Sequence, residues 1–209
     1  MSTACIEVIT ADSNHIVINK PSGLLSVPGR QIQESAVSQL ISQFGEIHVV
    51  HRLDMDTSGI LVFARNKTSL THLQQQFEKQ KTHKIYEAVI EGHLKQSNGS
   101  INMPILVDWP NRPKQHINHS DGRYALTRWQ IRNYQQRNNQ PTTRVDLLPK
   151  TGRSHQLRVH CQQLGHPIVG DSLYSDKPGN NRLHLHSREL GFFHPTTNQW
   201  CSYFITAPF

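Results

Sequence analysis

The chain has 209 residues, and its 22 lysines and arginines exceed its 15 aspartates and glutamates, which gives a formal net charge of +7 at pH 7. This length suits one main domain with one good core, and the basic balance favours a polyanionic partner such as nucleic acid, although an ordinary basic surface would give the same charge. Three widely spaced cysteines, the lack of an apolar run of about 18 residues and the lack of a secretory leader pattern argue against a disulfide framework and a membrane span, and they favour a soluble cytoplasmic protein.

A hairpin and then a loop are predicted at the start of the chain. Residues 6–8 and 16–18 alternate apolar and polar side chains around the turn-forming residues 12–14, which is typical of two paired strands. The loop of residues 20–30, KPSGLLSVPGR, contains two prolines and two glycines, so turn chemistry fixes its backbone. Its leucines and valine are expected to pack into the core, and Lys20 could reach a phosphate.

Two helices are predicted in the first half of the chain. Apolar residues fall at helical spacing over Glu34–Phe44, and Gly45 stands where a C-terminal cap belongs. A second helix is expected over about Thr68–Lys81, with two leucines and a phenylalanine on one face. Both helices are interpreted as packing elements with solvated outer faces rather than as carriers of chemistry.

The stretch His51–Ala64, HRLDMDTSGILVFA, places charged residues on a loop directly before an apolar segment. Residues 60–63 read as a strand buried on both faces, so Asp54 is expected on a loop that a rigid strand anchors, where reactive side chains usually lie. Arg52 could keep the Asp54 carboxylate ionised, and an ionised carboxylate can act as a nucleophile or a base. The alternative is that Asp54 or Asp56 only caps a turn.

Two further stretches combine aromatic and charged residues. Lys84–Glu91, KIYEAVIE, alternates like a strand and puts Tyr86 on its apolar face, where a tyrosine usually belongs to the core. Asp108–Gln115, DWPNRPKQ, predicts an ordered surface loop, because its two prolines do not suit regular structure. A cation such as Arg112 beside Trp109 suits a nucleic-acid contact, and the alternative is a linker that Trp109 packs against the core.

Strands are also expected in the second half of the chain. Tyr124–Tyr134 and Thr142–Leu148 read as two paired strands joined by the polar segment of residues 135–141. The C-terminal stretch WCSYFITAPF contains a last strand that is expected to complete the sheet.

A second stretch with chemical potential is TGRSHQLRVH, residues 151–160. It begins with a glycine turn and continues into a helix that Gly165 closes. The N-terminus of a helix that is preceded by glycine and flanked by arginine is a natural anion site. Arg153 and Arg158 could therefore meet phosphate, or one of them could pair with Asp54.

Other chemistries fit the pattern less well. His184 and His186 share a strand face and His155 lies near His160, but the spacing and the missing acidic and thiol partners favour no metal site. A metal-dependent phosphotransferase would need Mg²⁺ ligands and a parallel sheet, whereas the strands here mostly read as antiparallel. An aspartic-protease dyad would need a second copy of the Asp-Thr-Ser-Gly loop. A non-catalytic RNA-binding module stays a third possibility.

Five blocks, taken in order, resemble the RluA-type family of RNA pseudouridine synthases: NKPSGLLSVPGR, HRLDMDTSGILVFA, KIYEAVIEG, TGRSHQLRVHCQQLGHPIVGD and RLHLHS. The resemblance covers nearly the whole chain. It implies an α+β fold, with one catalytic domain over residues 1–209, a mixed and mostly antiparallel sheet flanked by helices and loops, and no separate N-terminal RNA-binding module. WPNRPKQ and the short length are most similar to the dual-specificity subgroup, which modifies large-subunit ribosomal RNA and the anticodon stem-loop of transfer RNA.

The resemblance implies three catalytic residues. Asp54 of HRLD matches the family's essential aspartate, Tyr86 of KIYEAV matches the tyrosine that stacks on the uracil and is implicated in removing its C5 proton, and Arg158 of GRSHQLR matches the residue that pairs with the aspartate. Arg52 would contact RNA or fill the space that a flipped base leaves, and Leu185 would pack against the uracil. With the basic residues identified above, the expected substrate-binding residues are Arg52, His51, Leu185, Arg153, Lys20 and Arg112.

The implied reaction breaks the N1 glycosidic bond, rotates the uracil and joins C5 to the same ribose carbon. Nothing is oxidised and no group leaves, so no cofactor is expected. Asp54 could attack covalently or take a sugar proton. A stacked uracil exposes neither face, so the enzyme has to extrude it. The expected partner is ribosomal RNA, transfer RNA or both, without a membrane, and analogy with the family suggests a monomer.

Overall fold

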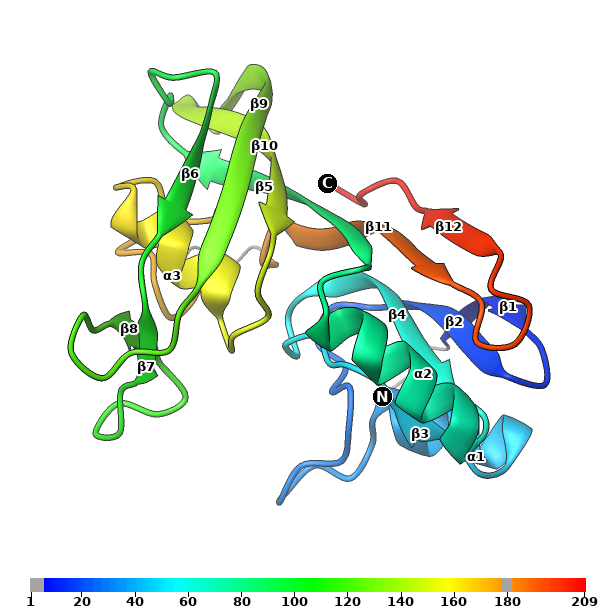
Figure 1. Ribbon diagram of the computed structural model, residues 1–209. Coiled ribbons are helices and arrows are strands. Elements are labelled where there is room, and N and C mark those ends of the chain that lie inside the picture. The colour runs from blue at the N-terminus through cyan, green and yellow to red at the C-terminus, as the bar shows by residue number, and fades with distance from the viewer. Residues whose placement is uncertain (1–5, 178–181) are drawn as a thin grey trace. The chain divides into compact units, whose positions relative to one another are not determined.

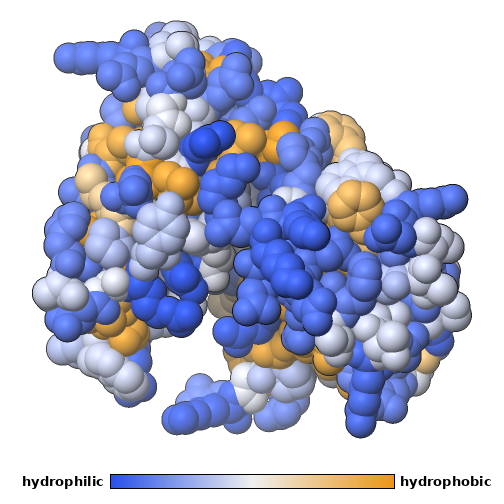
Figure 2. Space-filling view, in the orientation of Figure 1, coloured by the Kyte–Doolittle hydropathy of each residue, from blue (hydrophilic) through white to orange (hydrophobic). Residues whose placement is uncertain are grey.

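The computed structural model describes residues 6–177 and 182–209, which form two structural units (Figure 1). The first unit contains residues 6–84 and 186–208, and the second contains residues 85–177 and 182–185 together with Phe209. Both units combine helices with mostly antiparallel strands, which confirms the predicted α+β class. The prediction of a single catalytic domain stays a prediction. Hydrophilic residues cover most of the visible face of each unit (Figure 2).

The first unit is built around strand β4 (Ser58–Ala64), in which every residue is buried. Its antiparallel neighbour is β2 (His15–Lys20), which forms the predicted hairpin with β1 (Glu7–Ala11). On its other side β4 pairs in parallel with β11 (Leu185–Phe193), and β12 (Trp200–Phe204) is the predicted last strand and pairs with β11. The segment predicted from the sequence as a strand buried on both faces is therefore the centre of this sheet.

Both predicted helices of the first unit are present. They are α1 (Ala36–Phe44) and α2 (Lys67–Glu78), and the short strand β3 (His48–Val49) lies between them in the chain and pairs with β4. α1 begins later than predicted because the Ser35 side chain caps its N-terminus. α2 ends before the predicted Lys81 because Gln80 has a positive φ of 54°, a backbone conformation that stops a helix.

Gly59 allows β4 and β11 to approach each other closely. It has a φ of 112°, and a Cβ atom at this position would clash with the backbone oxygen of Ser187. Replacing Gly59 by alanine should therefore force the strands apart and lower the free energy of unfolding by about 3 kcal/mol or more. Urea denaturation measures this loss. Gly152→Ala is the control, because a Cβ atom there meets nothing within 4 Å. Equal stability of the Gly59→Ala and wild-type proteins would contradict the close approach.

Four antiparallel strands and one helix form most of the second unit. In spatial order the strands are β5 (His83–Glu91), β10 (Gln140–Pro149), β9 (Leu126–Arg137) and β6 (Asn98–Asn102). Helix α3 (Gln156–Gln163) contributes Leu157 and Cys161 to the buried core that it shares with these strands. The short strands β7 (Ile105–Val107) and β8 (Gln115–Ile117) form a separate hairpin.

Of two connections predicted in the second unit, one differs from the prediction and one agrees with it. Residues 135–141 are predicted as a polar connection, but β9 and β10 continue through most of this segment, and only Asn138 and Asn139 form the turn. Both asparagines have a positive φ, which suits a two-residue hairpin loop because asparagine tolerates the left-handed region. Asp108–Gln115 forms the predicted loop up to Gln115, which begins β8. The flanking strands β7 and β8 were not predicted, because strands of three residues are too short to leave a periodic signal in the sequence.

Two predictions from composition concern cysteines and membranes. Cys161 and Cys201 are free thiols, which agrees with the argument against a disulfide framework, and Cys5 lies outside the described residues. Within residues 6–177 and 182–209, none of the helices combines the length and the apolar character that crossing a membrane requires.

Candidate active site and RNA interface

Asp54 lies in the turn that leads into β4. The Thr57 N–H donates a hydrogen bond to the Asp54 carbonyl oxygen at 3.1 Å, so the backbone itself closes the turn. Leu53 is buried, whereas Asp54 is half-buried and keeps contact with solvent. This is the predicted position, a loop anchored by a rigid strand, and it leaves the carboxylate available for chemistry.

The segment that follows β2 forms hydrogen bonds to the backbone on both sides of Asp54, and we call this set of hydrogen bonds the clamp. The Ser26 hydroxyl donates to the Leu53 carbonyl oxygen at 2.7 Å and accepts from the Leu53 N–H at 3.1 Å. The Ser22 hydroxyl donates to the Asp56 carbonyl oxygen at 2.7 Å. Because residues before and after Asp54 are both held, the carboxylate starts from a defined position, which a reactive group requires. Sequence reasoning missed both serines.

Lys20 belongs to the same clamp and not to the surface. Its side chain is fully buried, and Nζ donates hydrogen bonds to the carbonyl oxygens of Pro21, Leu24 and Met55 at 2.8, 2.7 and 2.9 Å. A buried ammonium group cannot reach RNA, so this position does not suit the phosphate contact predicted for Lys20. In the sequence, a lysine at the start of a loop rich in proline and glycine reads as an exposed cation, because lysine is almost never fully buried.

Replacing Lys20 by methionine should strongly destabilise the protein. Methionine fills a similar volume but leaves three carbonyl oxygens without this donor, so the free energy of unfolding should fall by about 3 kcal/mol or more. Urea denaturation measures the change. Lys79→Met, at the exposed end of α2, is the control and should stay within about 0.5 kcal/mol of wild type. A Lys20→Met protein as stable as this control would remove Lys20 from the clamp.

His51 and Arg52 have different surroundings. The His51 ring stacks on Phe77 of α2 with the ring centroids 4.5 Å apart, and its Nε2 accepts a hydrogen bond from the Val62 N–H at 3.4 Å. Burial, with a smaller effect of Lys84, lowers the pKa of His51 to about 3, so the ring is uncharged at neutral pH. Arg52 is exposed. His51 therefore anchors the loop by packing, whereas Arg52 has the access to solvent that its predicted RNA contact needs.

Tyr86 and Leu185 pack against one core cluster of the second unit. Leu185 is buried in this cluster, and the half-buried Tyr86 packs against it from the face of β5 that also carries Ala88 and Ile90. The predicted face of Tyr86 is thus confirmed. The uracil contacts predicted for Tyr86 and Leu185 stay predictions.

Arg158 forms a buried ion pair that sequence reasoning missed. Its Nε donates to Asp171 Oδ2 at 2.8 Å and its Nη2 donates to Asp171 Oδ1 at 2.7 Å, and the two side chains are 3% and 0% exposed. The pair fixes the plane of the guanidinium group and balances its charge. A phosphate contact, the other role predicted for Arg158, does not suit this buried position. The sequence did contain one signal for this pair, the acidic residue Asp171 at the end of the block GHPIVGD. A buried arginine needs such an acidic partner.

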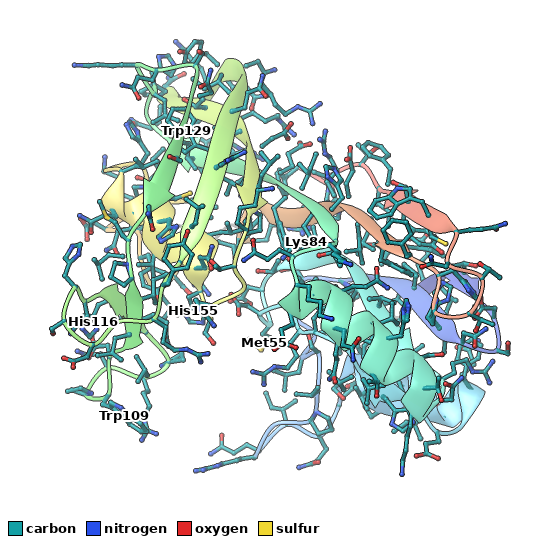
Figure 3. The ribbon with its side chains drawn as sticks, viewed as in Figure 1. Met55, Lys84, Trp109, His116, Trp129 and His155 are labelled. Atoms are coloured by element: carbon teal, nitrogen blue, oxygen red, sulfur yellow. The ribbon has the colours of Figure 1, made fainter. Side chains whose placement is uncertain are left out.

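The β7–β8 hairpin carries an exposed cation–aromatic pair in its connecting loop. Figure 3 shows the aromatic residue of the pair, Trp109, at the end of this loop. Trp109 is 64% exposed, and the Arg112 guanidinium lies 4.5 Å from the centroid of its ring. The Asp108 carboxylate accepts hydrogen bonds from the side-chain nitrogen of Asn111 at 3.1 and 3.0 Å and so orders the loop. The alternative of a linker packed by Trp109 is wrong, because the ring does not enter the core. An ordered, exposed aromatic ring with a cation is the arrangement on which unpaired bases stack.

Arg153 lies near a second cation of the second unit. Its Nε donates to the Tyr124 carbonyl oxygen at 3.0 Å, and its backbone N–H donates to Gln156 Oε1 at 3.0 Å. Burial, and after it the nearby charge of Arg123, lower the pKa of Arg153. Two neighbouring guanidinium groups repel each other and favour an anion beside them. The position therefore suits the phosphate contact predicted for Arg153, which stays a prediction.

Two of the four histidines considered as metal ligands in the sequence, His155 and His160, form other contacts. His155 Nδ1 lies 2.7 Å from the Tyr174 hydroxyl. His160 bonds through Nδ1 to the Thr127 hydroxyl at 2.9 Å and through Nε2 to the Met103 carbonyl oxygen at 3.1 Å. Both nitrogens of His160 are thus engaged, which leaves none for a metal.

One other group, Asp12, His15 and His194, brings three possible ligand atoms within 4.8 Å of one another. His194 Nε2 lies 2.9 Å from Asp12 Oδ2, and His194 Nδ1 accepts hydrogen bonds from the backbone N–H groups of Thr196 and Thr197 at 3.2 and 3.1 Å. Because Nδ1 is an acceptor, the ring proton sits on Nε2 and points at Asp12. In a histidine that binds a metal through Nε2, the proton is on Nδ1 and Nε2 is unprotonated. We therefore interpret this group as a hydrogen-bonded cluster.

The sequence matches the family model described as RNA pseudouridylate synthase over residues 14–163. The dual-specificity RNA pseudouridine synthase RluA of Vibrio vulnificus is 47% identical over 209 residues, which covers 97% of this chain and 84% of the relative. The protein of the same name from Escherichia coli K12 is 42% identical over 193 residues, which covers 90% of this chain and 87% of the relative. Among solved structures, human RNA Pseudouridylate Synthase Domain Containing 1 is similar with a TM-score of 0.84 and 27% identity, over 100% of this chain and 87% of that chain.

Proposed function

We propose substrates and catalytic residues for this chain, which belongs to the RNA pseudouridylate synthase family and is an RNA pseudouridine synthase, an isomerase. The observation that carries the proposal is the clamped turn at Asp54, because it holds a solvent-accessible carboxylate in place through its neighbours Leu53 and Asp56. The enzyme acts as a monomer in the cytoplasm on uridines in RNA.

The proposed substrates are specific uridines in large-subunit ribosomal RNA and in the anticodon stem-loop of transfer RNA. Relatives that are 42% and 47% identical carry the description dual-specificity RNA pseudouridine synthase. The block WPNRPKQ, which resembles the same subgroup, forms the tip of the β7–β8 hairpin with its exposed Trp109. The net charge of +7 adds attraction for any RNA, and this part of the affinity falls as salt rises.

Three residues carry the proposed reaction on an extruded uridine. Asp54 assists loss of the base from the ribose, either by covalent attack or by taking a sugar proton. Tyr86 stacks on the extruded uracil and takes part in removing the C5 proton after the new bond forms. Arg158, whose guanidinium plane Asp171 fixes, is the third catalytic residue of the proposal, as the resemblance to the family implies. The base leaves and rejoins the same ribose, so the reaction calls for no coenzyme.

The two alternative functions are not supported. A metal-dependent phosphotransferase would use a parallel sheet built from strand–helix–strand units, whereas β2 with β4, β5 with β10 and β9 with β10 are antiparallel pairs. The relatives described above are synthases, which argues against a non-catalytic RNA-binding module.

Removing the exposed ring of Trp109 should weaken RNA binding without slowing the chemical step. Stacking of a base on an aromatic ring contributes about 1–3 kcal/mol, so Trp109→Ala should raise KM for the anticodon stem-loop by about 5- to 100-fold, with kcat within about twofold of wild type. Steady-state kinetics measure both constants. Trp200→Leu removes another exposed tryptophan, on β12, and should leave KM unchanged. An unchanged KM in Trp109→Ala would exclude the hairpin tip from substrate binding.

Mapping of the product tests the proposed substrates. The purified protein is incubated with a large-subunit ribosomal RNA fragment or with an anticodon stem-loop, and pseudouridine is located by carbodiimide modification and primer extension. We expect modification at a defined uridine in each RNA. Modification of only one of the two RNAs would reject dual specificity and leave the isomerase activity in place.

A further inference from the structure

Tyr174 connects two parts of the second unit to which the proposed function gives separate roles. One is the β7–β8 hairpin with its exposed Trp109, and the other is Arg158 with its partner Asp171. The side chain of Tyr174 is 5% exposed and contacts both through different parts of the same phenol.

The ring of Tyr174 contacts the guanidinium group of Arg158. The two groups lie 5.2 Å apart, measured from the guanidinium carbon to the ring centroid. Asp171 holds both partners, because its Oδ1 accepts from Arg158 Nη2 at 2.7 Å and from the Tyr174 N–H at 3.1 Å. The carboxylate that orients the guanidinium therefore also sets the turn that places the aromatic ring against it.

The hydroxyl of Tyr174 holds the hairpin. Its oxygen accepts a hydrogen bond from the N–H of Gln115, the first residue of β8, at 2.8 Å, and lies 2.7 Å from Nδ1 of His155. The ring also belongs to the small core that Ile105 and Ile117 of the hairpin contact. A hairpin with strands of three residues is not stable alone, so its orientation depends on such contacts.

We infer that Tyr174 is a positioning residue that fixes the RNA-binding hairpin through its hydroxyl and the guanidinium of Arg158 through its ring. This inference rests on the proposed function, since it assigns substrate binding to the hairpin and catalysis to Arg158. Neither role was visible in the sequence, where Tyr174 is one aromatic residue in the segment after GHPIVGD.

The two parts of the phenol can be separated by substitution. Tyr174→Phe keeps the ring against Arg158 and removes the hydroxyl, so KM for the anticodon stem-loop should rise about fivefold while kcat stays within about twofold of wild type. Asp171→Asn weakens the hold on Arg158 and should lower kcat by about tenfold or more with little change in KM. Tyr134→Phe, which removes the hydroxyl that an exposed tyrosine donates to the Leu94 carbonyl oxygen, is the matched control and should change neither constant.

A double-mutant cycle distinguishes positioning of the hairpin from a general loss of stability. If the Tyr174 hydroxyl acts through Trp109, the rise in KM caused by Tyr174→Phe should largely disappear in the Trp109→Ala background. Effects on KM that multiply fully in the double variant would overturn the inference. So would an unchanged KM in Tyr174→Phe. If Tyr174→Phe does not fold, His155→Asn removes the other partner of the hydroxyl and keeps a residue that tolerates the φ of 53° found there.

The test of Tyr174 and the test of the proposed function can fail independently of each other. Failure of the wild-type protein to modify either RNA would reject the proposed function. An active wild-type protein whose Tyr174→Phe and His155→Asn variants both keep the wild-type KM would reject only the role of Tyr174.

Discussion

Replacing Asp54 by asparagine should lower kcat by about 10³-fold or more while the affinity for RNA stays within about threefold of wild type. Asparagine keeps the shape of the side chain, and the clamp on Leu53 and Asp56 uses backbone atoms, so the loop should keep its structure. What is lost is the charged oxygen that attacks the ribose or takes its proton. Single-turnover kinetics and a filter-binding assay measure the two quantities separately.

Asp56→Asn is the matched control for this variant. It makes the same chemical change two residues later in the same turn, at a side chain that is also half-buried. We expect turnover close to that of wild type. Normal turnover in Asp54→Asn together with lost turnover in Asp56→Asn would move the catalytic role to Asp56.

Removing only the hydroxyl of Tyr86 should also cost most of the activity. Tyr86→Phe keeps the ring that packs against the core cluster of Ala88 and Leu185, so stability and stacking on the uracil should change little. If the hydroxyl takes part in removing the C5 proton, kcat should fall by about 10²-fold or more with KM nearly unchanged, in line with the usual contribution of a general base. Tritium release from RNA labelled at uridine C5 measures this step.

Tyr134→Phe serves as the control for Tyr86→Phe as well, because it removes a tyrosine hydroxyl from the exposed part of β9. Full activity of the Tyr86→Phe protein would remove the hydroxyl from the mechanism and leave Tyr86 only a stacking role. A large rise in KM without a change in kcat would assign the hydroxyl to substrate binding instead of to the chemical step.

The position of Asp54 could be predicted because its signals are local. A continuous apolar run marks β4, the charged residues immediately before it mark a loop, and the block HRLDMDTSG resembles one family. The faces of β5 and the two helices of the first unit follow from periodicity in the same way. Boundaries differed where a cap decided them, as at Ser35 and Gln80.

The residues that support the site could not be predicted, because their partners are distant in the sequence. Ser26 bonds to a residue 27 positions away, and Arg158 bonds to one 13 positions away, and such pairs leave no periodic pattern. Lys20 was placed wrongly because its own charge was misleading. Its charge suggested the surface, whereas three carbonyl oxygens compensate its burial inside the fold.

The role of Asp54 without a metal is tested by the release of tritium from an anticodon stem-loop labelled at uridine C5, with EDTA present and no coenzyme added. We predict that the wild-type protein releases the label at the target uridine under these conditions and that the Asp54→Asn protein releases none in the same time. Release at the wild-type rate by the Asp54→Asn protein, or a complete loss of wild-type release on addition of EDTA, would contradict a mechanism in which this carboxylate acts without a metal.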